Sequence, residues 1–557
     1  MKVLLVRVGN EDVTFYVENG SERVLENRNN EEPGLDALSM YLEFHYNYEP
    51  VIISVNDYEE LSSKIKLYNP DIVGFTSYLY NIKKVLKFSK LTKDEFNIPI
   101  CLGGIAATAY YDDIIKVDSG LDFIVVGEGE IPFSQLIKCI QNDDLDYSNI
   151  PNLIYKTDNG YIKNEYKRQL ISLDDDIFPK HKLLYKKVEF AFLSSSRGCV
   201  KNCSFCISRN FWGKWRGRCI KSIIDEIVYI IDNFGIVNFF ITDNSFEDPS
   251  LDRTFSILEE IRKRDLNIVL RVFMRPETML KINENQFNLL RSSGIYNIYL
   301  GVESGNEKDL ILYNKPHTLE QNNSAINILK KEKIGCQNFG FINLNPYSDY
   351  NTLFNNANFL NQNSCFTIKK FMSIYKNFKG TSIYNRIQED GLLKDQNYLD
   401  FDNTTNYNFV NIVAQKFYDF NIAFANTKQF IFEQQFSNFY IEHKLFIYKI
   451  LRYLENYKVQ SDKKSNLISL LNNYLDEVEK ISENNSNFLF EWAVNVINQC
   501  DNNTNINTIL NNTEKVLCSS DRMSTYNDLE TKIKRIILQI YKFNDDQLNK
   551  LCVWQEW

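Results

Sequence analysis

The sequence predicts an α/β protein with an open, doubly wound parallel sheet at its N-terminal end, a central partial (β/α)6 TIM-type barrel and a C-terminal all-helical domain. Three observations predict this fold class. Short β-like runs alternate with helical stretches up to about residue 146, a second alternating series begins near residue 189, and glycine is absent after Gly391. Strands that alternate with helices are typical of βαβ units and parallel sheets.

The first series, within residues 1–146, contains five β-like runs. They are residues 3–8, 51–55, 72–77, 99–104 and 122–130. Stretches with helical apolar spacing lie between them, and right-handed crossovers then give an open doubly wound layer. The ligand site of such a sheet lies beyond the carboxyl ends of its strands, where the loops carry Ser77, Gly103, Gly104 and Gly127.

A connector and a second series of strands follow the sheet. Residues 147–188 have weak periodicity and scattered charge, so we expect them to link the sheet to the barrel. Residues 189–393 contain about six strand–helix units. The expected strands are residues 190–195, 238–243, 267–274, 297–304, 338–344 and 368–375. A barrel of this kind carries its reactive groups at the C-terminal ends of its strands.

The remaining residues, 394–557, are expected to form helices only. They contain no glycine and no proline, the residues that usually interrupt helices. Leu467, Leu470, Leu471, Tyr474 and Val478 follow an i, i+3, i+4, i+7, i+11 spacing, which is typical of an amphipathic helix.

The composition limits the class of protein. The net charge of −9 argues against general nucleic-acid binding, which needs clustered lysine and arginine. The apolar N-terminal run is too short for a signal peptide, and no window reaches the roughly 18 uninterrupted apolar residues of a membrane span. We therefore expect a cytoplasmic protein, whose 11 cysteines are mostly free thiols or metal ligands.

Three cysteines lie close together just after the first strand of the second series. Cys199, Cys203 and Cys206 have the spacing C-x3-C-x2-C, which lets one loop wrap its thiolates around an inorganic centre. An iron–sulfur cluster with three thiolates keeps one iron open to bind a substrate. A zinc site would need a fourth ligand, for which His181 and Cys219 are the nearest candidates. Buried structural thiols, or a disulfide with one thiol left over, would also account for three cysteines in one loop.

The run CVKNCSFC at residues 199–206 resembles the signature of the radical S-adenosylmethionine (radical SAM) superfamily. Residues 215–246, 297–318 and 378–393 also resemble segments of that family. The resemblance implies a [4Fe–4S] cluster on three thiolates, with its open iron chelating S-adenosylmethionine. One electron then cleaves S-adenosylmethionine to methionine and a 5′-deoxyadenosyl radical.

The same resemblance implies which residues contact S-adenosylmethionine. They follow the second strand, lie near the end of the third, or follow the fourth: Asp243, Asn244, Arg271, Glu303 and Ser304. The fifth strand departs from the family pattern, because Leu344 stands where relatives usually have glycine. The resemblance gives no residue a catalytic role beyond binding these groups.

The N-terminal part resembles the Rossmann-like, cobalamin-binding domain found in members of this superfamily. Ser77 and Leu79 match its S-x-L motif, Gly103 and Gly104 match its paired glycines, and Gly127 and Glu128 begin its GEGE end. Glycine lets the backbone approach a cofactor closely. The D-x-H-x-x-G motif is missing after the first strand, so cobalamin would bind without this histidine, or the domain would serve only as a scaffold.

The resemblance therefore implies a radical SAM enzyme that abstracts hydrogen from an unactivated carbon and methylates that carbon with cobalamin. Two different functions stay open: an oxidoreductase or cyclase that acts without cobalamin, and a non-catalytic cobalamin- or metal-binding sensor. A methylthiotransferase is disfavoured because only Cys101 and Cys139 precede the connector. An electron donor such as flavodoxin or ferredoxin is the expected partner, and a peptide, a natural-product intermediate or a lipid is the expected substrate.

Overall fold

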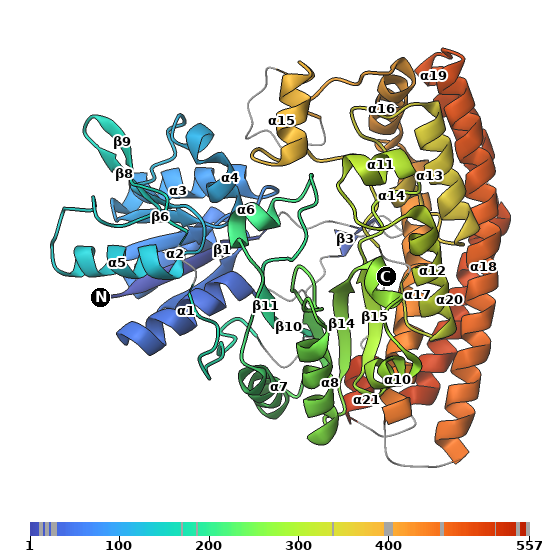
Figure 1. Ribbon diagram of the computed structural model, residues 1–557, viewed down its shortest axis with the longest axis horizontal. Helices are drawn as coiled ribbons and strands as arrows, with labels where there is room; N and C mark the ends of the chain where they lie inside the picture. Colours follow the sequence, from blue (N-terminus) through green and yellow to red (C-terminus); the bar gives the residue numbers. More distant parts are fainter. Residues whose placement is uncertain are drawn as a thin grey trace.

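A computed structural model of the chain shows the N-terminal sheet on one side, the barrel in the middle and long C-terminal helices on the other side (Figure 1). The structure describes residues 1–9, 15–16, 22–23, 31–168, 171–184, 188–336, 339–394, 405–456, 462–517, 520–541 and 546–552. In these residues there is no helix whose length and apolar character would let it cross a bilayer.

The N-terminal sheet has seven strands in the order β4-β1-β5-β6-β7-β8-β9. Its five predicted strands are confirmed and parallel: β1 (Val3–Val8), β4 (Val51–Val55), β5 (Ile72–Thr76), β6 (Ile100–Gly103) and β7 (Phe123–Val125). The segment expected to be a connector adds two antiparallel strands, β8 (Leu153–Thr157) and β9 (Gly160–Lys163). It therefore extends the sheet as well as leading to the barrel.

Helices cover both faces of this sheet, as the doubly wound prediction requires. Leu4 and Val6 of β1 face one core, and Val3 and Leu5 face the other, because successive strand residues point to opposite faces. The first core also contains residues of α2 (Tyr58–Tyr68), α3 (Ile82–Phe96) and α4 (Ile105–Ile114). The second contains residues of α1 (Pro33–Tyr46) and α5 (Glu130–Gln141).

The barrel begins with four parallel strands in the order β10-β13-β14-β15. They are β10 (Ala191–Leu193), β13 (Asn238–Ile241), β14 (Val269–Met274) and β15 (Ile295–Leu300). The connecting helices are α7 (Ile220–Phe234), α8 (Asp252–Lys263), α9 (Pro276–Met279) and α10 (Glu284–Ser292). The first four predicted barrel strands are thus confirmed, and the partial barrel has the predicted parallel order.

Isolated bridges continue the barrel after β15. Phe341 bridges Glu303, and Leu344 bridges Ile374, while Asn338 of the fifth predicted strand lies outside the described residues. The prediction of a strand over residues 368–375 is wrong in its first half, which is the helix α14 (Ile368–Phe371). Thr367 caps that helix by accepting a hydrogen bond from the Lys370 N–H. The helices of this region are α11 (Glu307–Leu312), α12 (Leu319–Lys331), α13 (Tyr350–Gln362) and α15 (Ser382–Glu389).

Two short hairpin pairings complete the strands. β11 (Ser196–Arg197) pairs antiparallel with β12 (Arg216–Gly217), and the loop that they enclose contains α6 (Ser208–Trp212). β2 (Phe15–Tyr16) pairs antiparallel with β3 (Glu22–Arg23).

The C-terminal part is helical, as predicted. Its helices are α16 (Ile412–Phe424), α17 (Lys428–Asn456), α18 (Asp462–Asp501), α19 (Ile506–Leu517), α20 (Ser520–Tyr541) and α21 (Asp546–Leu551). α17 packs against β15 and α18, and α18 also packs against α13 of the barrel. Four of the five residues in the predicted apolar stripe of α18 are buried, and Leu470 is 40% exposed.

Candidate functional site

A cavity of about 560 Å³ lies between the sheet and the barrel. Its sheet side is formed by residues that follow or end the parallel strands: Thr76, Gly103, Gly104, Gly127 and Glu128. Its barrel side includes Ser194, Ser196, Arg197, Thr242 and Asn244. The cavity therefore lies at the carboxyl ends of the sheet strands, which is the expected ligand site of a doubly wound sheet, and its volume is within the usual range for ligand pockets.

The paired glycines on this wall have different structural roles. Gly104 has φ +97°, and a Cβ on it would lie 2.6 Å from the carbonyl oxygen of Ser77, so no other residue fits there. A Cβ on Gly103 would meet no atom within 4 Å. Gly103 therefore leaves open space at the cavity wall, as a closely approaching cofactor requires.

The two predicted residues of the S-x-L motif are not on the cavity wall. The Ser77 hydroxyl donates to the Gly103 carbonyl at 2.8 Å and accepts from the Ala107 N–H at 3.1 Å, which fixes the two loops together. Leu79 packs against a core of the sheet. Tyr78 and Tyr80, which the sequence reasoning missed, line the cavity with their rings stacked at 5.3 Å.

One limb of the cavity reaches the sheet face that α1 and α5 cover. It is lined by Leu5, Gly74, Cys101, Val125 and Phe133. A Cβ on Gly74 would lie 3.1 Å from Leu5 and 3.3 Å from Phe133, so these two side chains pack closely over this glycine. An apolar group suits this limb.

The three clustered cysteines lie in the loop between β11 and α6. Cys199, Cys203 and Cys206 are free thiols and partly buried. In the described part of the chain, they do not form a group of ligand atoms that all lie within 4.8 Å of one another. Cys199 and Cys206 are among the charges that raise the pKa of the Cys203 thiol, so the three side chains lie near one another.

Charges of both signs lie near this loop: Lys315 and Arg275, and the carboxylates of Glu303 and Glu247. Burial raises the pKa of Cys203 to about 11, and the positive charge of Lys315 opposes this rise. Burial also raises the pKa of Cys199, opposed in part by Arg275. Cysteine binds a metal as the thiolate, so positive charge around the loop favours the form that a cluster needs.

Asp243 and Asn244, at the end of β13, occupy different environments. Asp243 is 2% exposed and accepts hydrogen bonds from the backbone N–H groups of Ser195 (2.7 Å) and Ser196 (3.0 Å) and from both hydroxyls. It therefore holds the turn between β10 and β11. Asn244 lines the cavity and donates to the Ser208 hydroxyl at 2.8 Å.

The other three predicted S-adenosylmethionine contacts do not line the described cavity. The Arg271 guanidinium lies 4.6 Å from the centre of the Phe240 ring. Glu303 has φ +67° and pairs with Lys315 at 3.3 Å.

Ser304 is fully buried, and its hydroxyl lies within hydrogen-bonding distance of Asp309 (2.9 Å) and Asn356 (2.8 Å). The structure thus brings Glu303 close to the cysteine loop through Lys315, which neighbours Cys203. Ser304 belongs to the loop that follows β15, and its hydroxyl joins this loop to α11 and α13.

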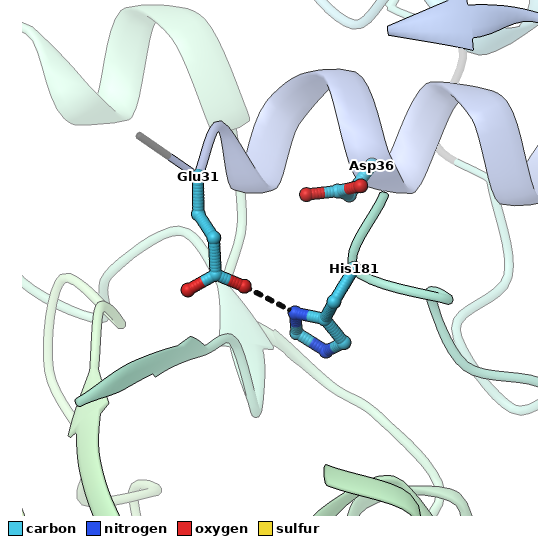
Figure 2. Close-up of side chains that lie close together, drawn as sticks. All are labelled: Glu31, Asp36 and His181. Atoms are coloured by element: carbon cyan, nitrogen blue, oxygen red, sulfur yellow. Dashed lines mark hydrogen bonds and ion pairs between the residues drawn. The ribbon is translucent and has the colours of Figure 1, made fainter. Parts of the chain in front are cut away.

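Glu31, Asp36 and His181 form a buried group beside the cavity (Figure 2). Figure 2 shows Glu31 before α1, Asp36 within it and His181 on a separate loop. The His181 Nδ1 lies 2.5 Å from Glu31 and the Nε2 lies 2.9 Å from Glu226 of α7.

Burial opposes a charged imidazole there, but hydrogen bonds and charges from Glu226 and Glu31 outweigh it and raise the pKa of His181 to about 10. A charged imidazole has no lone pair for a metal. This group is therefore an ion-pair junction between sheet and barrel, and His181 does not serve the cysteines as a fourth zinc ligand.

Family models match both parts that form the cavity. One described as "B12 binding domain" matches residues 30–137, and one described as "Radical SAM superfamily" matches residues 193–353. These matches imply cobalamin, a [4Fe–4S] cluster and S-adenosylmethionine as cofactors. The residues present fit these groups: the wall is open at Gly103, one limb of the cavity is apolar, and three free thiols share one loop.

Two curated relatives share part of their length with this chain. An uncharacterized methyltransferase of Pyrococcus horikoshii is 30% identical over 285 residues, which is 49% of this chain and 60% of the relative. The anaerobic magnesium-protoporphyrin IX monomethyl ester cyclase of Rubrivivax gelatinosus is 28% identical over 291 residues, which is 50% of this chain and 51% of the relative. The chain thus spans less than two thirds of either relative.

A solved structure is similar over almost the whole chain. It is the cobalamin-dependent S-adenosylmethionine radical enzyme OxsB with aqua-cobalamin and S-adenosylmethionine bound. The TM-score is 0.65 at 17% identity, and the match covers 99% of this chain and 83% of that chain. At this identity the likeness shows a common fold.

Proposed function

We propose that this chain, in which a B12-binding domain precedes a radical SAM domain, is a cobalamin-dependent enzyme that methylates an unactivated carbon. The observation that carries the proposal is the shared cavity wall. Arg197 lines the same cavity as Gly103, Gly104 and Gly127. It also begins the loop that holds the three clustered cysteines. The proposed cobalamin site and the proposed iron–sulfur site thus adjoin each other.

The cysteine loop is the proposed ligand set for the cluster. Cys199, Cys203 and Cys206 would hold three irons and leave the fourth open to S-adenosylmethionine. Asn244, Arg271 and Glu303 are the proposed direct contacts of S-adenosylmethionine. We propose that Asp243 and Ser304 act indirectly, because hydrogen bonds already occupy their side chains. Those of Asp243 come from the turn after β10, and those of Ser304 join it to α11 and α13.

The glycine wall is the proposed cobalamin site. Gly103, Gly104 and Gly127 would let the backbone approach the corrin ring, while Ser77 and Leu79 would hold the loops from behind. Glu128 is a further proposed contact on the same wall. The apolar limb around Gly74 suits the flat nucleotide base of the cofactor.

When bound, the reduced cluster with S-adenosylmethionine supplies a 5′-deoxyadenosyl radical, and cobalamin supplies a methyl group. The chain's own contribution is to hold the substrate carbon between these groups and to exclude water, which protects a radical from side reactions. Each turnover would consume two electrons, one to cleave S-adenosylmethionine and one to return cobalamin to the state that takes up the next methyl group, so we propose flavodoxin or ferredoxin as the partner.

The test is an anaerobic incubation with S-adenosylmethionine, hydroxocobalamin and a reductant, followed by mass spectrometry of the products. We expect both 5′-deoxyadenosine and S-adenosylhomocysteine, because a methyltransferase takes its methyl group from a second S-adenosylmethionine. Cys199→Ala should abolish 5′-deoxyadenosine, while Cys219→Ala, which removes a partly buried cysteine outside the motif, should not.

Different product patterns would contradict the proposal. 5′-Deoxyadenosine without S-adenosylhomocysteine would indicate an oxidoreductase or cyclase, and a cyclase is what the Rubrivivax gelatinosus relative is named for. Formation of neither product would indicate a non-catalytic cobalamin- or metal-binding sensor.

A further inference from the structure

The base of the cysteine loop is built from two arginines that lie opposite each other. β11 and β12 close the loop, and in their antiparallel register Arg197 is the direct partner of Arg216. Like charges at directly opposite positions of a strand pair repel each other. The Arg197 side chain is only 9% exposed and that of Arg216 only 16%, so water screens this repulsion poorly.

Two carboxylates from the N-terminal domain compensate these charges. Glu128 lies 2.8 Å from Arg197 and also pairs with Arg216, so one carboxylate bridges the two arginines. Glu130, the first residue of α5, lies 2.6 Å from the other guanidinium nitrogen of Arg197. Both glutamate side chains are about as buried as Arg197, at 5% and 6% exposed.

Further contacts hold the side chains of the two arginines in place. The Arg197 guanidinium lies 5.2 Å from the centre of the Trp212 ring, which belongs to α6 inside the cysteine loop. Arg216 donates to the carbonyl oxygen of Ile171 at 3.0 Å, which is part of the link between the domains. The carboxylates, the two arginines and Trp212 therefore form one contact from the sheet to the cysteine loop.

We propose that Glu128 and Glu130 are positioning residues, which close the base of the cysteine loop and so set the iron–sulfur site against the cavity of the B12-binding domain. Part of the GEGE motif would then act on the loop of the other domain rather than on cobalamin alone. The consequence for methyl transfer rests on the proposed function, whereas the order of the loop does not depend on it.

The first test uses hydrogen exchange of the full chain without cofactors. In Glu128→Gln we expect exchange in peptides from residues 198–217 to speed up at least about tenfold, because two buried arginines lose their shared anion. Exchange in β13, β14 and β15 should stay unchanged. Glu130→Gln leaves Glu128 in place and should give a smaller acceleration in the same peptides, so it tests the proposal even if Glu128→Gln does not fold.

The control is Glu165→Gln, because the Glu165 side chain is 74% exposed and pairs with Lys167 in a surface ion pair. It should leave the loop unchanged. If Glu128→Gln and Glu130→Gln weaken cobalamin binding but leave exchange of residues 198–217 as in the wild type, the glutamates are cofactor contacts and the proposal is wrong.

The second test measures position directly. Pulsed dipolar electron paramagnetic resonance between the reduced cluster and cob(II)alamin gives the distance between the two centres in the loaded protein. We expect the distance distribution to broaden or shift in Glu130→Gln and to match the wild type in Glu165→Gln. An unchanged distribution in Glu130→Gln would overturn the positioning role, whether or not the protein transfers methyl groups.

Discussion

Gly103 and Gly104 adjoin each other at the end of β6, and the structure separates their roles. Gly104 has a left-handed backbone and a close contact with the Ser77 carbonyl. Gly103 faces open space. At the scale of single residues, then, one glycine serves the fold and the other leaves room for a ligand.

These roles predict different outcomes for the two alanine substitutions. Gly104→Ala should lower the midpoint of thermal unfolding of the cofactor-free protein, because strain and the 2.6 Å contact together cost about 1–3 kcal/mol. Gly103→Ala should leave that midpoint within the error of the wild type but weaken hydroxocobalamin binding at least about tenfold. Calorimetry and a cobalamin titration measure the two effects. Equal loss of stability in both variants would contradict the assignment.

The sequence located the loops of the candidate site, while the binding roles of their residues stay predictions. Cysteine spacing placed three thiols on one loop, and Gly103 and Gly104 lie on the cavity wall. Ser77 and Leu79 do not line the cavity, because a loop presents alternate residues to it, and Tyr78 and Tyr80 face it instead. A motif thus located the loop but not the direction of its side chains.

At the scale of elements, the local sequence predicted the parallel strands of the sheet better than its antiparallel strands and the last strand of the barrel. Continuous apolar runs marked β1, β4, β5, β6 and β7, because both faces of a parallel strand are buried. β8 lies between β7 and the edge strand β9, and three of the four β9 residues are exposed, so this short antiparallel pair lacks the apolar run of a buried strand. Residues 368–371 alternate too little to define a strand, since two lysines stand between Ile368 and Phe371, and the Thr367 cap and packing against α17 favour a helix.

α17 and α18 illustrate a contact between elements that sequence spacing did not reveal. His443 of α17 is fully buried, and its Nδ1 lies 2.5 Å from the hydroxyl of Tyr474 of α18. That hydroxyl donates to the Leu529 carbonyl at 3.1 Å, so the histidine is the donor to the tyrosine oxygen. The neutral imidazole can make this bond, and its burial disfavours the charged form.

This contact predicts acid sensitivity of the helical part. Burial lowers the pKa of His443 to about 3, from 6.5. Below pH 6.5 the imidazole is therefore protonated in the unfolded chain but stays neutral in the folded protein. The free energy of unfolding falls as the pH drops. Between pH 7 and pH 5 the wild type should lose about 2 kcal/mol relative to His443→Gln, as measured by denaturant unfolding. If the free energy of unfolding changes equally with pH in the wild type and in His443→Gln, this prediction is wrong.

At the scale of the whole molecule, charged groups join the sheet to the barrel beside the cavity. One junction consists of Glu31, Asp36 and His181 with Glu226, and another involves Glu128. The sequence did not predict either junction. Their members are far apart in the chain, and no local pattern marks a buried ion pair between domains.

Asp36 gives the first junction a pH dependence that can be measured. Burial raises the pKa of Asp36 to about 7, against the pull of His181, from 3.8 in the unfolded chain. The folded protein keeps a proton that the unfolded chain releases above about pH 4, so stability falls as the pH rises toward 7. Relative to Asp36→Asn, the wild type should lose about 4 kcal/mol between pH 4 and pH 8 in denaturant unfolding.

The control for this prediction is Asp118→Asn, because the Asp118 side chain is 74% exposed and pairs with Lys90 at the surface. It should follow the wild-type pH curve. If the free energy of unfolding of the wild type changes with pH as that of Asp36→Asn does, Asp36 is ionised in the folded protein, contrary to its raised pKa.

The most direct test of the central claim is electron paramagnetic resonance of the anaerobically reconstituted, reduced protein, recorded with and without S-adenosylmethionine. We predict the spectrum of a [4Fe–4S]⁺ cluster that changes when S-adenosylmethionine is added, because three cysteines leave one iron open. Cys203→Ala should lose the signal, and Cys219→Ala should keep it. A protein that binds one zinc ion without sulfide, or a cluster spectrum that S-adenosylmethionine leaves unchanged, would contradict the claim.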